Sequence, residues 1–529
     1  MKDKSFTQSS DEREAAFEYL VAELPSESLN SSPERKRAIY GAFEARDARF
    51  DGRVYAAISS TGVYCRPVCP YHAKIENVTF YSTAAEAEEA GYRPCLVCRP
   101  ETAPGLSSAD ARKSLARRAA AMIQEECTAG DGLEKLSARL GYTDRHVRRV
   151  FQDEFGVTPM QFLMTCRLRL AKAMLADTDL SMTDVAKAAG FKSTRRFNDA
   201  FKRHYGLVPS EQRRISKSRS ADASSTGAAI RLRLGYRPPL RFGELLAIFR
   251  DRALVGVEVV GEESYARTAR MARPDGKEVS GWIRVEHDPN HNALVLSISE
   301  SLLPATSMVV ARVRRMFDLD CDPETVHGGL TALDALRPGS NVIGTRLPGC
   351  FDPFETCCRA VLGQQVSVAA ANKLAARIVE EIGSQVHTGV EGLDRAWPCA
   401  SEISSLDDVS GVLGQLGVIR TRASVIAEIA CMAISGDLRF DALADPFEQM
   451  NALLSVKGIG PWTANYIAMR AYSYPDAFLE KEAGVAHALP DIAPKERIEA
   501  VEPCRPWRSY AVICLWNSLG KQVSNPKGE

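Results

Sequence analysis

Four cysteines in the N-terminal part of the chain have the types and spacing of a metal site. Cys65 and Cys69 lie in "GVYCRPVCPYH", and after 25 intervening residues Cys95 and Cys98 lie in "GYRPCLVC". Two such pairs fit a tetrahedral site for one zinc ion. The alternative, two unrelated pairs of core thiols, is disfavoured because both pairs sit in proline-containing turns. Zinc-bound thiolates are deprotonated and electron-rich, so an exposed one can attack an alkyl carbon.

A second candidate for chemistry is the charged run in "DAFLEKEAGVAHAL", residues 476–489. Glu480, Lys481 and Glu482 stand between a strand-like apolar start and an Ala- and Gly-rich helical end. Most such runs are solvated turns. A carboxylate in this position could instead stabilise positive charge that develops in a reaction. The local sequence does not distinguish a solvated turn from a carboxylate that takes part in a reaction, so motifs elsewhere in the chain have to decide.

Two segments predict pairs of helices separated by a turn. "LEKLSARLGYTDRHVRRVFQDEFG" turns at Gly141, and "MTDVAKAAGFKSTRRFNDAFKRHYG" turns at Gly190. Each second helix is basic on the side away from its apolar stripe, and Arg and Asn make bidentate contacts to guanine and adenine edges. A helix bundle with a solvated basic face is the alternative. The side chains expected to face DNA are Arg145, His146, Arg148 and Arg149 on the first helix and Thr194, Arg195, Arg196, Asn198 and Lys202 on the second.

A fourth motif is the glycine pair in "LLSVKGIGPWTANYIAMRAY". Gly458 and Gly460 follow one helical pattern, and Pro461 suits the first position of the next helix. Glycines at a helix N-terminus let backbone N–H groups approach a phosphate. With helical patterns on both sides, the segment is a helix-hairpin-helix candidate.

Length and composition limit the classes of protein to which these motifs can belong. The 529 residues are too many for one core, and contents of 45% hydrophobic and 25% charged residues are ordinary for a globular protein. No apolar run is long enough to span a bilayer and no secretory signal begins the chain, so a cytoplasmic protein is expected.

The net charge is zero, yet residues 111–220 carry 22 Lys and Arg against 12 Asp and Glu. That local surplus suggests a polyanionic partner. The other ten cysteines are expected to be mostly buried free thiols.

The motifs fall into separate segments of the chain. A polar tail to residue 35 precedes a cysteine-containing unit over 36–103 and a helical unit over 108–216. The Ser- and Ala-rich stretch 217–229 reads as a flexible linker. Alternating segments over 230–318 predict an antiparallel sheet with helices, and 319–529 is helical with Gly and Pro punctuation. The fold class expected is therefore multidomain, mainly α with α+β parts.

The first half resembles Ada-type alkylation-response regulators. "STGVYCRPVC", "ENVTFY" and "AGYRPCLVCRP" resemble the Ada N-terminal zinc domain, and the two helix pairs resemble an AraC-type DNA-binding domain. The resemblance implies that Cys65 accepts a methyl group from a DNA methyl phosphotriester, with Cys69, Cys95 and Cys98 as the other zinc ligands. Methylation would remove one negative charge and weaken repulsion of DNA phosphates. The Pro-Cys-His-Arg motif of alkylguanine transferases is absent, so that repair reaction is not expected.

The second half resembles AlkA-type 3-methyladenine DNA glycosylases of the helix-hairpin-helix superfamily. "RLPGCFDPFETCCRAVLGQQVSVAAANKLAARIV", "GIGPWTANYIAMR" and "PWRSYAVICLW" carry the resemblance, and 230–318 resembles the family's N-terminal domain. Trp462, Tyr466 and Trp516 match its pocket aromatics, whose faces attract a cationic flipped base. Gln365 falls where the family inserts a wedge side chain. Glu482 falls where the family has Asp, one methylene shorter.

The function expected from both resemblances is that of an Ada–AlkA fusion. Its first half would take a methyl group irreversibly and regulate transcription, and its second half would excise alkylated purines by hydrolysis. Trp462 stands where nicking glycosylases carry Lys, so a monofunctional enzyme is expected. The alternative is a regulator whose glycosylase-like half is inactive and only binds damaged DNA. The expected cofactor is one zinc ion, and the expected partners are double-stranded DNA, alkylated or promoter, and RNA polymerase. We expect a monomer that associates with the nucleoid and makes no membrane contact.

Overall fold

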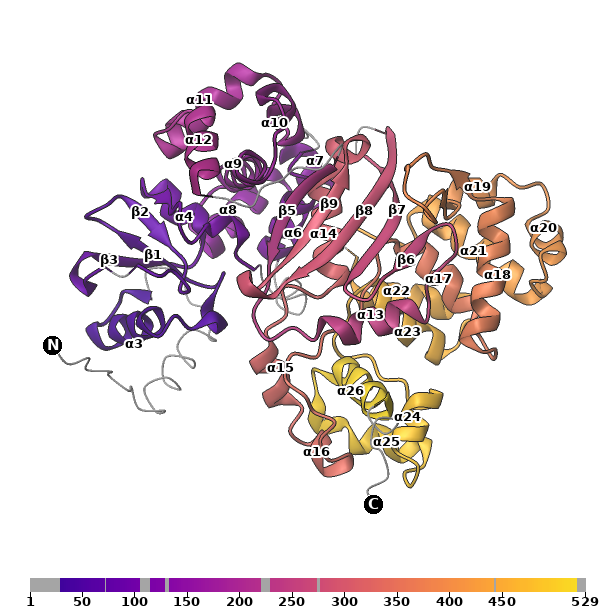
Figure 1. Ribbon diagram of the computed structural model, residues 1–529. Coiled ribbons are helices and arrows are strands. Elements are labelled where there is room, and N and C mark those ends of the chain that lie inside the picture. The colour runs from indigo at the N-terminus through magenta and orange to yellow at the C-terminus, as the bar shows by residue number, and fades with distance from the viewer. Residues whose placement is uncertain are drawn as a thin grey trace. The chain divides into compact units, whose positions relative to one another are not determined.

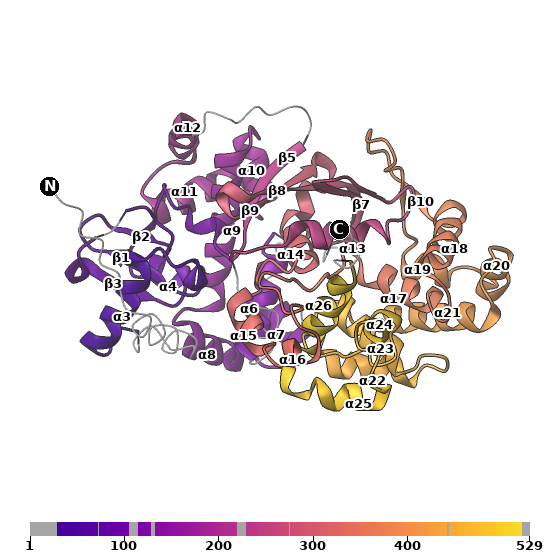
Figure 2. The same cartoon turned by 60° about the horizontal axis from the view of Figure 1, so that its bottom comes forward.

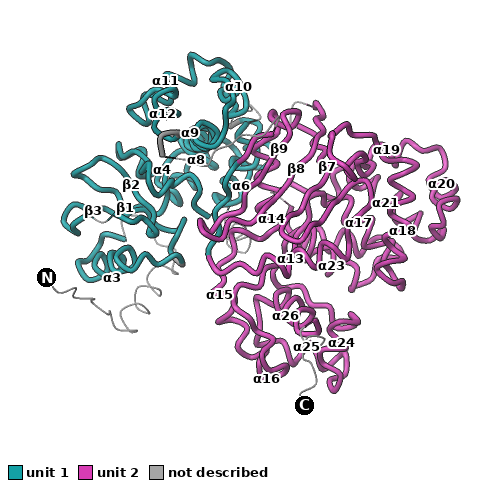
Figure 3. Tube along the Cα trace, in the orientation of Figure 1, with its two compact units in different colours: residues 1–106, 113–226, 232–237 teal, residues 107–112, 227–231, 238–529 magenta. Residues whose placement is uncertain are grey.

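The computed structural model describes residues 29–71, 73–104, 115–128, 133–219, 229–273, 276–441 and 444–520. The expected tail up to residue 28 and linker residues 220–228 lie outside this part. The chain forms two units, one of residues 1–106, 113–226 and 232–237, the other of residues 107–112, 227–231 and 238–529 (Figure 3). Within the described residues, no helix combines the length and apolar character that crossing a membrane requires.

A small sheet with the order β3-β1-β2-β4 opens the first unit (Figure 1). β1 pairs antiparallel with β2 and β3, whereas β2 and β4 run parallel. Ile39 and Phe43 of α3 pack with Phe80 of β3 in a core that includes Leu29, upstream of residue 36. The elements are α3 (Pro33–Glu44), η1 (Ala48–Phe50), β1 (Tyr55–Ile58), β2 (Val63–Cys65), η2 (Ile75–Asn77), β3 (Val78–Tyr81), α4 (Ala84–Glu89), β4 (Arg93–Pro94) and η3 (Pro100–Thr102).

Seven helices complete the described part of the first unit, and they contain the two predicted helix pairs. The second helix of each pair has a Thr or Ser cap: Thr143 accepts the N–H of His146, and Ser193 accepts that of Arg196. Each ends at a glycine in the left-handed conformation, where other residues are strained. The helices are α6 (Leu115–Glu126), α7 (Leu133–Leu140), α8 (Asp144–Phe155), α9 (Pro159–Asp177), α10 (Met182–Ala188), α11 (Thr194–Tyr205) and α12 (Pro209–Arg219).

A five-stranded sheet has the order β5-β9-β8-β7-β6, and its strands β6 to β9, which belong to the second unit, pair antiparallel. Phe249 of α13, Tyr265 of β7 and Phe317 at the end of α14 pack with ring centroids 5.4–5.9 Å apart, which joins these helices to the sheet. The sheet elements are β5 (Ala229–Gly235), α13 (Phe242–Arg250), β6 (Glu258–Val260), β7 (Ser264–Ala272), β8 (Glu278–Asp288), η4 (Pro289–His291), β9 (Ala293–Ser299), η5 (Glu300–Ala305) and α14 (Thr306–Met316).

The helices that follow form two groups with separate cores. Figures 1 and 2 show these helices from two directions. α23 contributes to both cores, with Ile467 in one and Met469 in the other. The first group is α17 (Pro353–Leu362), α18 (Val368–Glu381), β10 (Ser384–Gln385), β11 (Arg395–Ala396), α19 (Ala400–Ser404), α20 (Val409–Gln415), α21 (Arg420–Ser435), α22 (Pro446–Ser455) and α23 (Pro461–Ala471). The second is α15 (Pro323–Gly329), α16 (Leu333–Leu336), α24 (Ala483–Ala488), α25 (Pro494–Ala500), η6 (Glu502–Cys504) and α26 (Arg508–Gly520).

Candidate functional site

The four clustered cysteines converge at one edge of the small sheet. Cys65 is the last residue of β2, and Cys95 directly follows β4, the parallel neighbour of β2. Cys69 and Cys98 lie in the turns after them, and the four sulfur atoms lie within 4.8 Å of one another. A tetrahedral zinc ion with Zn–S bonds of about 2.3 Å holds its sulfurs about 3.8 Å apart. The donor set therefore fits one zinc ion, as the sequence predicts.

Backbone N–H groups distinguish the sulfur atoms. Arg66 N–H donates to Cys98 Sγ and Val97 N–H donates to Cys95 Sγ, each at 3.4 Å. Within the described residues, no backbone N–H group donates to Cys65 Sγ. A hydrogen bond stabilises a thiolate and makes it a weaker nucleophile. Buried Cys65 therefore lacks the backbone hydrogen bonds that Cys95 and Cys98 accept.

Arg66 fixes the second cysteine turn. Its buried guanidinium donates to the carbonyl oxygen of Cys98 at 3.2 Å and to Thr102 Oγ1 at 2.6 Å. Nε donates to Asp51 Oδ1 at 2.7 Å. Burial lowers the pKa of Arg66, but the Asp51 carboxylate outweighs it and holds the pKa above its usual value. This cation is therefore permanently paired beside the cluster.

The cysteine domain and the helix pairs of the first unit share a buried polar contact. Glu88 of α4 accepts the hydroxyl of Tyr64, the residue before Cys65, at 2.8 Å. Its other carboxylate oxygen accepts the hydroxyl of Thr165 on α9 at 2.8 Å and lies 3.3 Å from His204 Nε2 on α11. One carboxylate thus connects the strand that carries Cys65 with α9 and α11.

The residues expected to face DNA lie on the second helix of each pair. Most are exposed while the apolar residues of the same helices are buried, so each helix presents a basic outer face. His146 stacks on Tyr142, with centroids 5.2 Å apart. The exposed residues are Arg145, Arg148 and Arg149 of α8 and Arg195, Arg196, Asn198 and Lys202 of α11; His146 and Thr194 are half-buried.

Glu482 is the N-cap of α24 and is held by two donors. Its Oε2 accepts the backbone N–H of Val485 at 2.9 Å and the indole Nε1–H of Trp516 at 2.7 Å. Two predicted site residues from distant parts of the sequence are thus in direct contact. A carboxylate suits this position because its oxygen accepts an N–H group and its negative charge stabilises the N-terminus of α24.

Trp462 and Tyr466 stack one turn apart on α23. Their ring centroids lie 5.4 Å apart at an interplanar angle of 12°. Arg470 Nη1 donates to the Tyr466 hydroxyl at 3.0 Å. Burial alone would raise the pKa of Tyr466, but Arg470 and Arg252 outweigh it and lower the pKa to about 8.

These side chains line one cavity of about 830 Å³ in the second unit. Gln365, Gly458 and Gly460 also line it, and Gln365 adopts a positive φ of 55° in an exposed loop. The neighbouring Gln364 fastens this loop to the hairpin, because its Nε2 donates to Gly458 O and to Thr463 Oγ1, each at 3.0 Å. The cavity therefore brings together every residue predicted for the second half of the chain. Exposed Lys481 lines the same cavity.

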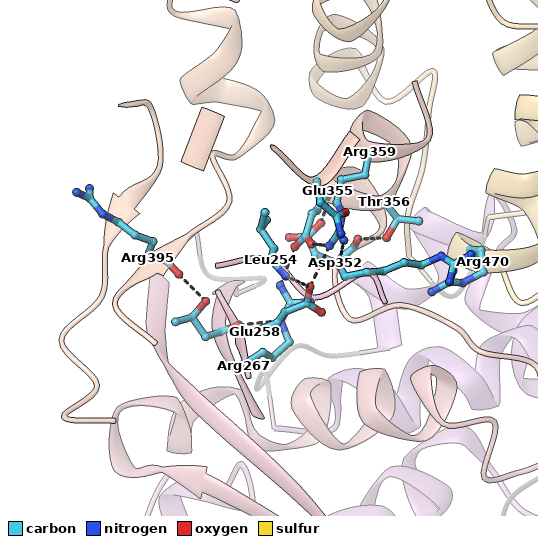
Figure 4. Close-up of polar contacts among 12 residues, drawn as sticks. Leu254, Glu258, Arg267, Asp352, Glu355, Thr356, Arg359, Arg395 and Arg470 are labelled. Atoms are coloured by element: carbon cyan, nitrogen blue, oxygen red, sulfur yellow. Dashed lines mark hydrogen bonds and ion pairs between the residues drawn. The ribbon is translucent and has the colours of Figure 1, made fainter. Parts of the chain in front are cut away.

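A network of buried charges that the sequence did not predict also lines the cavity (Figure 4). Arg267 donates to Glu355 at 2.7 Å, and Arg359 donates to Glu355 at 2.7 Å and to Glu258 at 3.0 Å. The four residues come from β6, β7 and α17, so the network joins the sheet to the helical region. A signal was present in sequence, since charges in the apolar patterns around Glu355 and Arg267 require partners when buried.

The remaining cysteines largely match expectation. Six of the ten are buried and three are half-buried, but Cys431 on α21 is exposed. Cys431 lies on a helix, as expected, but its exposure makes the expectation of a buried thiol wrong for this residue.

Family models match three successive parts of the chain. Residues 38–101 match the metal-binding domain of Ada, residues 136–215 a helix-turn-helix domain, and residues 231–352 the AlkA N-terminal domain. These ranges agree with the sites described above. The zinc cysteines, the exposed basic helices and the antiparallel sheet each lie within the corresponding match.

Three curated relatives cover the chain in whole or in part. A probable bifunctional transcriptional activator/DNA repair enzyme AlkA of Mycobacterium tuberculosis is 35% identical over 493 residues, 92% of this chain and 97% of the relative. DNA-3-methyladenine glycosylase 2 of Escherichia coli is 34% identical over 289 residues, 55% of this chain and 98% of the relative. The bifunctional transcriptional activator/DNA repair enzyme Ada of Escherichia coli is 33% identical over 154 residues, 29% of this chain and 42% of the relative.

The order of the domains, the four-cysteine site and a relative matched over nearly its whole length give one conclusion. The chain belongs to the family of bifunctional transcriptional activator/DNA repair enzymes in which an Ada-type zinc and helix-turn-helix half is joined to an AlkA-type glycosylase half.

Proposed function

We propose that the second half excises alkylated purines of the 3-methyladenine type by hydrolysing the N-glycosidic bond. The observation that carries this proposal is Glu482, a carboxylate held at the wall of an aromatic cavity by Trp516 and Val485. When the C1′–N bond breaks, the electron pair leaves with the base and the sugar becomes positively charged. Glu482 stabilises that charge, and water then adds to C1′.

Glu482 replaces the Asp of related glycosylases and is longer by one methylene. Two hydrogen bonds to Oε2 fix the position of its carboxylate. Preorganised charge costs no reorganisation during the reaction. This supports an active site over the alternative, a half that only binds damaged DNA. No lysine stands at position 462, which supports a monofunctional enzyme that leaves an abasic site.

The first half would accept a methyl group on Cys65 from a DNA methyl phosphotriester. Cys65 Sγ attacks the methyl carbon, the C–O bond breaks, and the phosphodiester leaves as an anion. A zinc ion bound by the four cysteines would keep their thiols deprotonated. Methylation makes Cys65 a neutral thioether, so the cluster loses one negative charge and repels DNA phosphates less. DNA, read by α8 and α11, is then bound more tightly.

The expected protein partner, location and oligomeric state follow from these two proposed activities. A regulator that activates transcription would contact RNA polymerase, and a DNA repair protein would reside with the nucleoid. Each half has its own complete set of site residues, which is compatible with a monomer.

The test measures both activities on one purified protein. Release of free 3-methyladenine from methylated DNA is expected from the parent, with a drop on the order of 100-fold or more in Glu482→Gln. Glu482→Asp keeps the charge but shortens its reach, and is expected to lie between the two. Cys65→Ser should lose methyl acceptance and leave excision unchanged. No release by the parent would contradict the proposal, and equal release by parent and Gln variant would remove Glu482 from it.

A further inference from the structure

Lys481 differs from the other cations that line the cavity of the second unit. The cationic side chains of described residues in its lining are Arg252, Arg267, Arg359, Arg470 and Lys481. Each of the guanidinium groups donates to an oxygen atom of the protein within 3.3 Å. Lys481 is exposed, and within the described residues its ammonium group has no hydrogen-bond or ion-pair partner. Its positive charge is therefore available to an anion from outside the chain.

The turn that carries Glu482 also fixes the backbone of Lys481. The Glu482 N–H donates to the carbonyl oxygen of Leu479 at 3.0 Å, which closes a turn with Glu480 and Lys481 at its centre. The buried side chain of Arg497 holds this turn, since its Nη1 donates to Glu480 O at 2.9 Å. Neighbouring Cα atoms lie about 3.8 Å apart. The lysine therefore starts from the same held turn as the carboxylate proposed to face the sugar.

A DNA substrate brings negative charge to this turn. Each sugar of the backbone is joined to two phosphates, so a nucleotide whose C1′ faces Glu482 carries its own anions with it. The base enters the cavity, whereas the phosphates stay at its mouth, because burying an unpaired anion costs free energy. Lys481 is the exposed cation of the cavity lining beside Glu482. A phosphate of the bound nucleotide is therefore the anion within reach of its long side chain.

The sign of the developing charge also favours a phosphate as the partner of Lys481. An unpaired ammonium group beside the reacting sugar would oppose the positive charge that forms there. An ammonium group paired with a phosphate adds little net charge to the surroundings of the sugar. The pairing therefore lets a lysine stand next to Glu482 without cancelling the effect of its carboxylate.

We propose that Lys481 binds a backbone phosphate of the nucleotide that enters the cavity and thereby positions C1′ of that nucleotide against Glu482. This inference rests on the glycosylase activity proposed above. Lys481 is a positioning residue, because it touches a phosphate that does not react and forms no covalent bond. A lysine suits this contact, since its compact charge and rotatable donors bind a phosphate as a point charge.

The test removes the charge from one partner at a time. Duplex oligonucleotides carry one 7-methylguanine, and the phosphate on its 5′ side or on its 3′ side is replaced by an uncharged methylphosphonate. The methyl group of this linkage is bonded to phosphorus, so it is no ester methyl that Cys65 could accept. Single-turnover excision by the full-length protein should fall roughly 10-fold for one of the two replacements, the worth of one hydrogen bond between charged groups.

Three variants identify the residue that reads the phosphate. Lys481→Met should lower the rate on the unmodified duplex by the same factor, and the sensitive methylphosphonate should lower it no further, since the contact is already lost. Lys481→Arg keeps the charge and should stay sensitive to that methylphosphonate. Lys495→Met is the matched control, because Lys495 is an exposed lysine of α25 outside the cavity lining; its rates should equal those of the parent on every duplex.

The outcomes separate this inference from the glycosylase proposal. If the methylphosphonates lower the rates of Lys481→Met and of the parent by equal factors, Lys481 does not act through a phosphate and the inference is wrong. It is also wrong if neither methylphosphonate affects the parent, or if Lys481→Met matches the parent on the unmodified duplex. If the parent releases no alkylated base, from this duplex or from methylated DNA, the glycosylase proposal itself fails, and the inference with it.

Discussion

Trp516 donates its indole N–H to Glu482 at 2.7 Å, although 34 residues separate them in sequence. The indole comes from α26 and the carboxylate from the first position before α24, and these helices pack against each other in one core. Gly484 makes the approach possible, because a Cβ there would lie 2.7 Å from the Trp516 ring. The ring therefore orients the carboxylate as well as lining the cavity.

Trp516→Phe should separate these two roles. Phe keeps an aromatic face but cannot donate to Glu482, whose carboxylate then keeps only the Val485 N–H. We expect 3-methyladenine excision to fall roughly 10- to 100-fold, because a displacement of about 1 Å has that effect. Single-turnover kinetics on methylated DNA measure it. Trp507→Phe, on a tryptophan outside the cavity lining, is the control; a Trp516→Phe rate equal to the parent's would show that the hydrogen bond does not matter.

Glu88→Ala should destabilise the first unit. It leaves the buried hydroxyls of Tyr64 and Thr165 without their acceptor. At roughly 1–3 kcal/mol for each unsatisfied group, the free energy of unfolding should fall by about 2–6 kcal/mol. Denaturant unfolding measures this change. Glu89→Ala, the exposed neighbour on α4, should alter stability by less than about 0.5 kcal/mol.

A second substitution of the same residue, Glu88→Gln, tests communication within the first unit. If Glu88 connects Cys65 with α9 and α11, Glu88→Gln should reduce the gain in DNA affinity that follows methylation of Cys65. Fluorescence anisotropy with a labelled promoter duplex, before and after methyl transfer, reads this gain. A gain equal to that of the parent would mean that methylation acts on DNA directly, through charge alone.

Removal of zinc should unfold the cysteine domain. Its cores are small and one of them consists largely of the ligands and their neighbours, so metal binding contributes folding free energy. Cys69→Ser should weaken zinc affinity beyond the roughly 10- to 100-fold that loss of an outer-shell partner causes. Metal content after dialysis and circular dichroism check both. Cys431→Ser, at an exposed thiol outside the cluster, should keep one zinc ion per chain.

The stability of the second unit should depend on pH through Asp318. Burial raises the pKa of this carboxyl to about 6, against the lowering effects of Arg346 and of the hydrogen bonds from Leu347 and Tyr510. A raised folded pKa means that the folded state holds the proton more firmly. The stabilisation is complete below pH 3.8, the ordinary value, and is lost as pH rises through about 6.

Asp318→Asn removes this titration. Relative to the parent, the variant should gain up to about 3 kcal/mol between pH 4 and pH 7, from roughly 1.4 kcal/mol per pKa unit. Thermal unfolding of parent and variant at pH 4.5, 5.5 and 7 provides the comparison. A constant difference between the two proteins at all three pH values would contradict the assignment.

Much of the candidate sites could be predicted because short-range spacing determines them. Cys65 with Cys69 and Cys95 with Cys98 are each a few residues apart, so a turn alone brings each pair together. The prediction for Gly458 and Gly460 likewise depends only on local backbone geometry, because glycines at a helix N-terminus let backbone N–H groups approach a phosphate. The exposed basic residues of α8 and α11 follow from helical periodicity, which separates an apolar face from a polar one.

Short-range patterns therefore predicted the zinc ligands, the paired helices and the hairpin, and the resemblance of the motifs predicted the family. Three contacts became known only from the folded chain: Trp516 holds Glu482, Arg252 lies over the Trp516 ring, and Glu88 connects α4 with α9 and α11. These contacts join residues far apart in sequence, and no local periodicity or turn chemistry encodes them. They depend on how helices and sheets pack, because only packing determines which buried charge meets which donor.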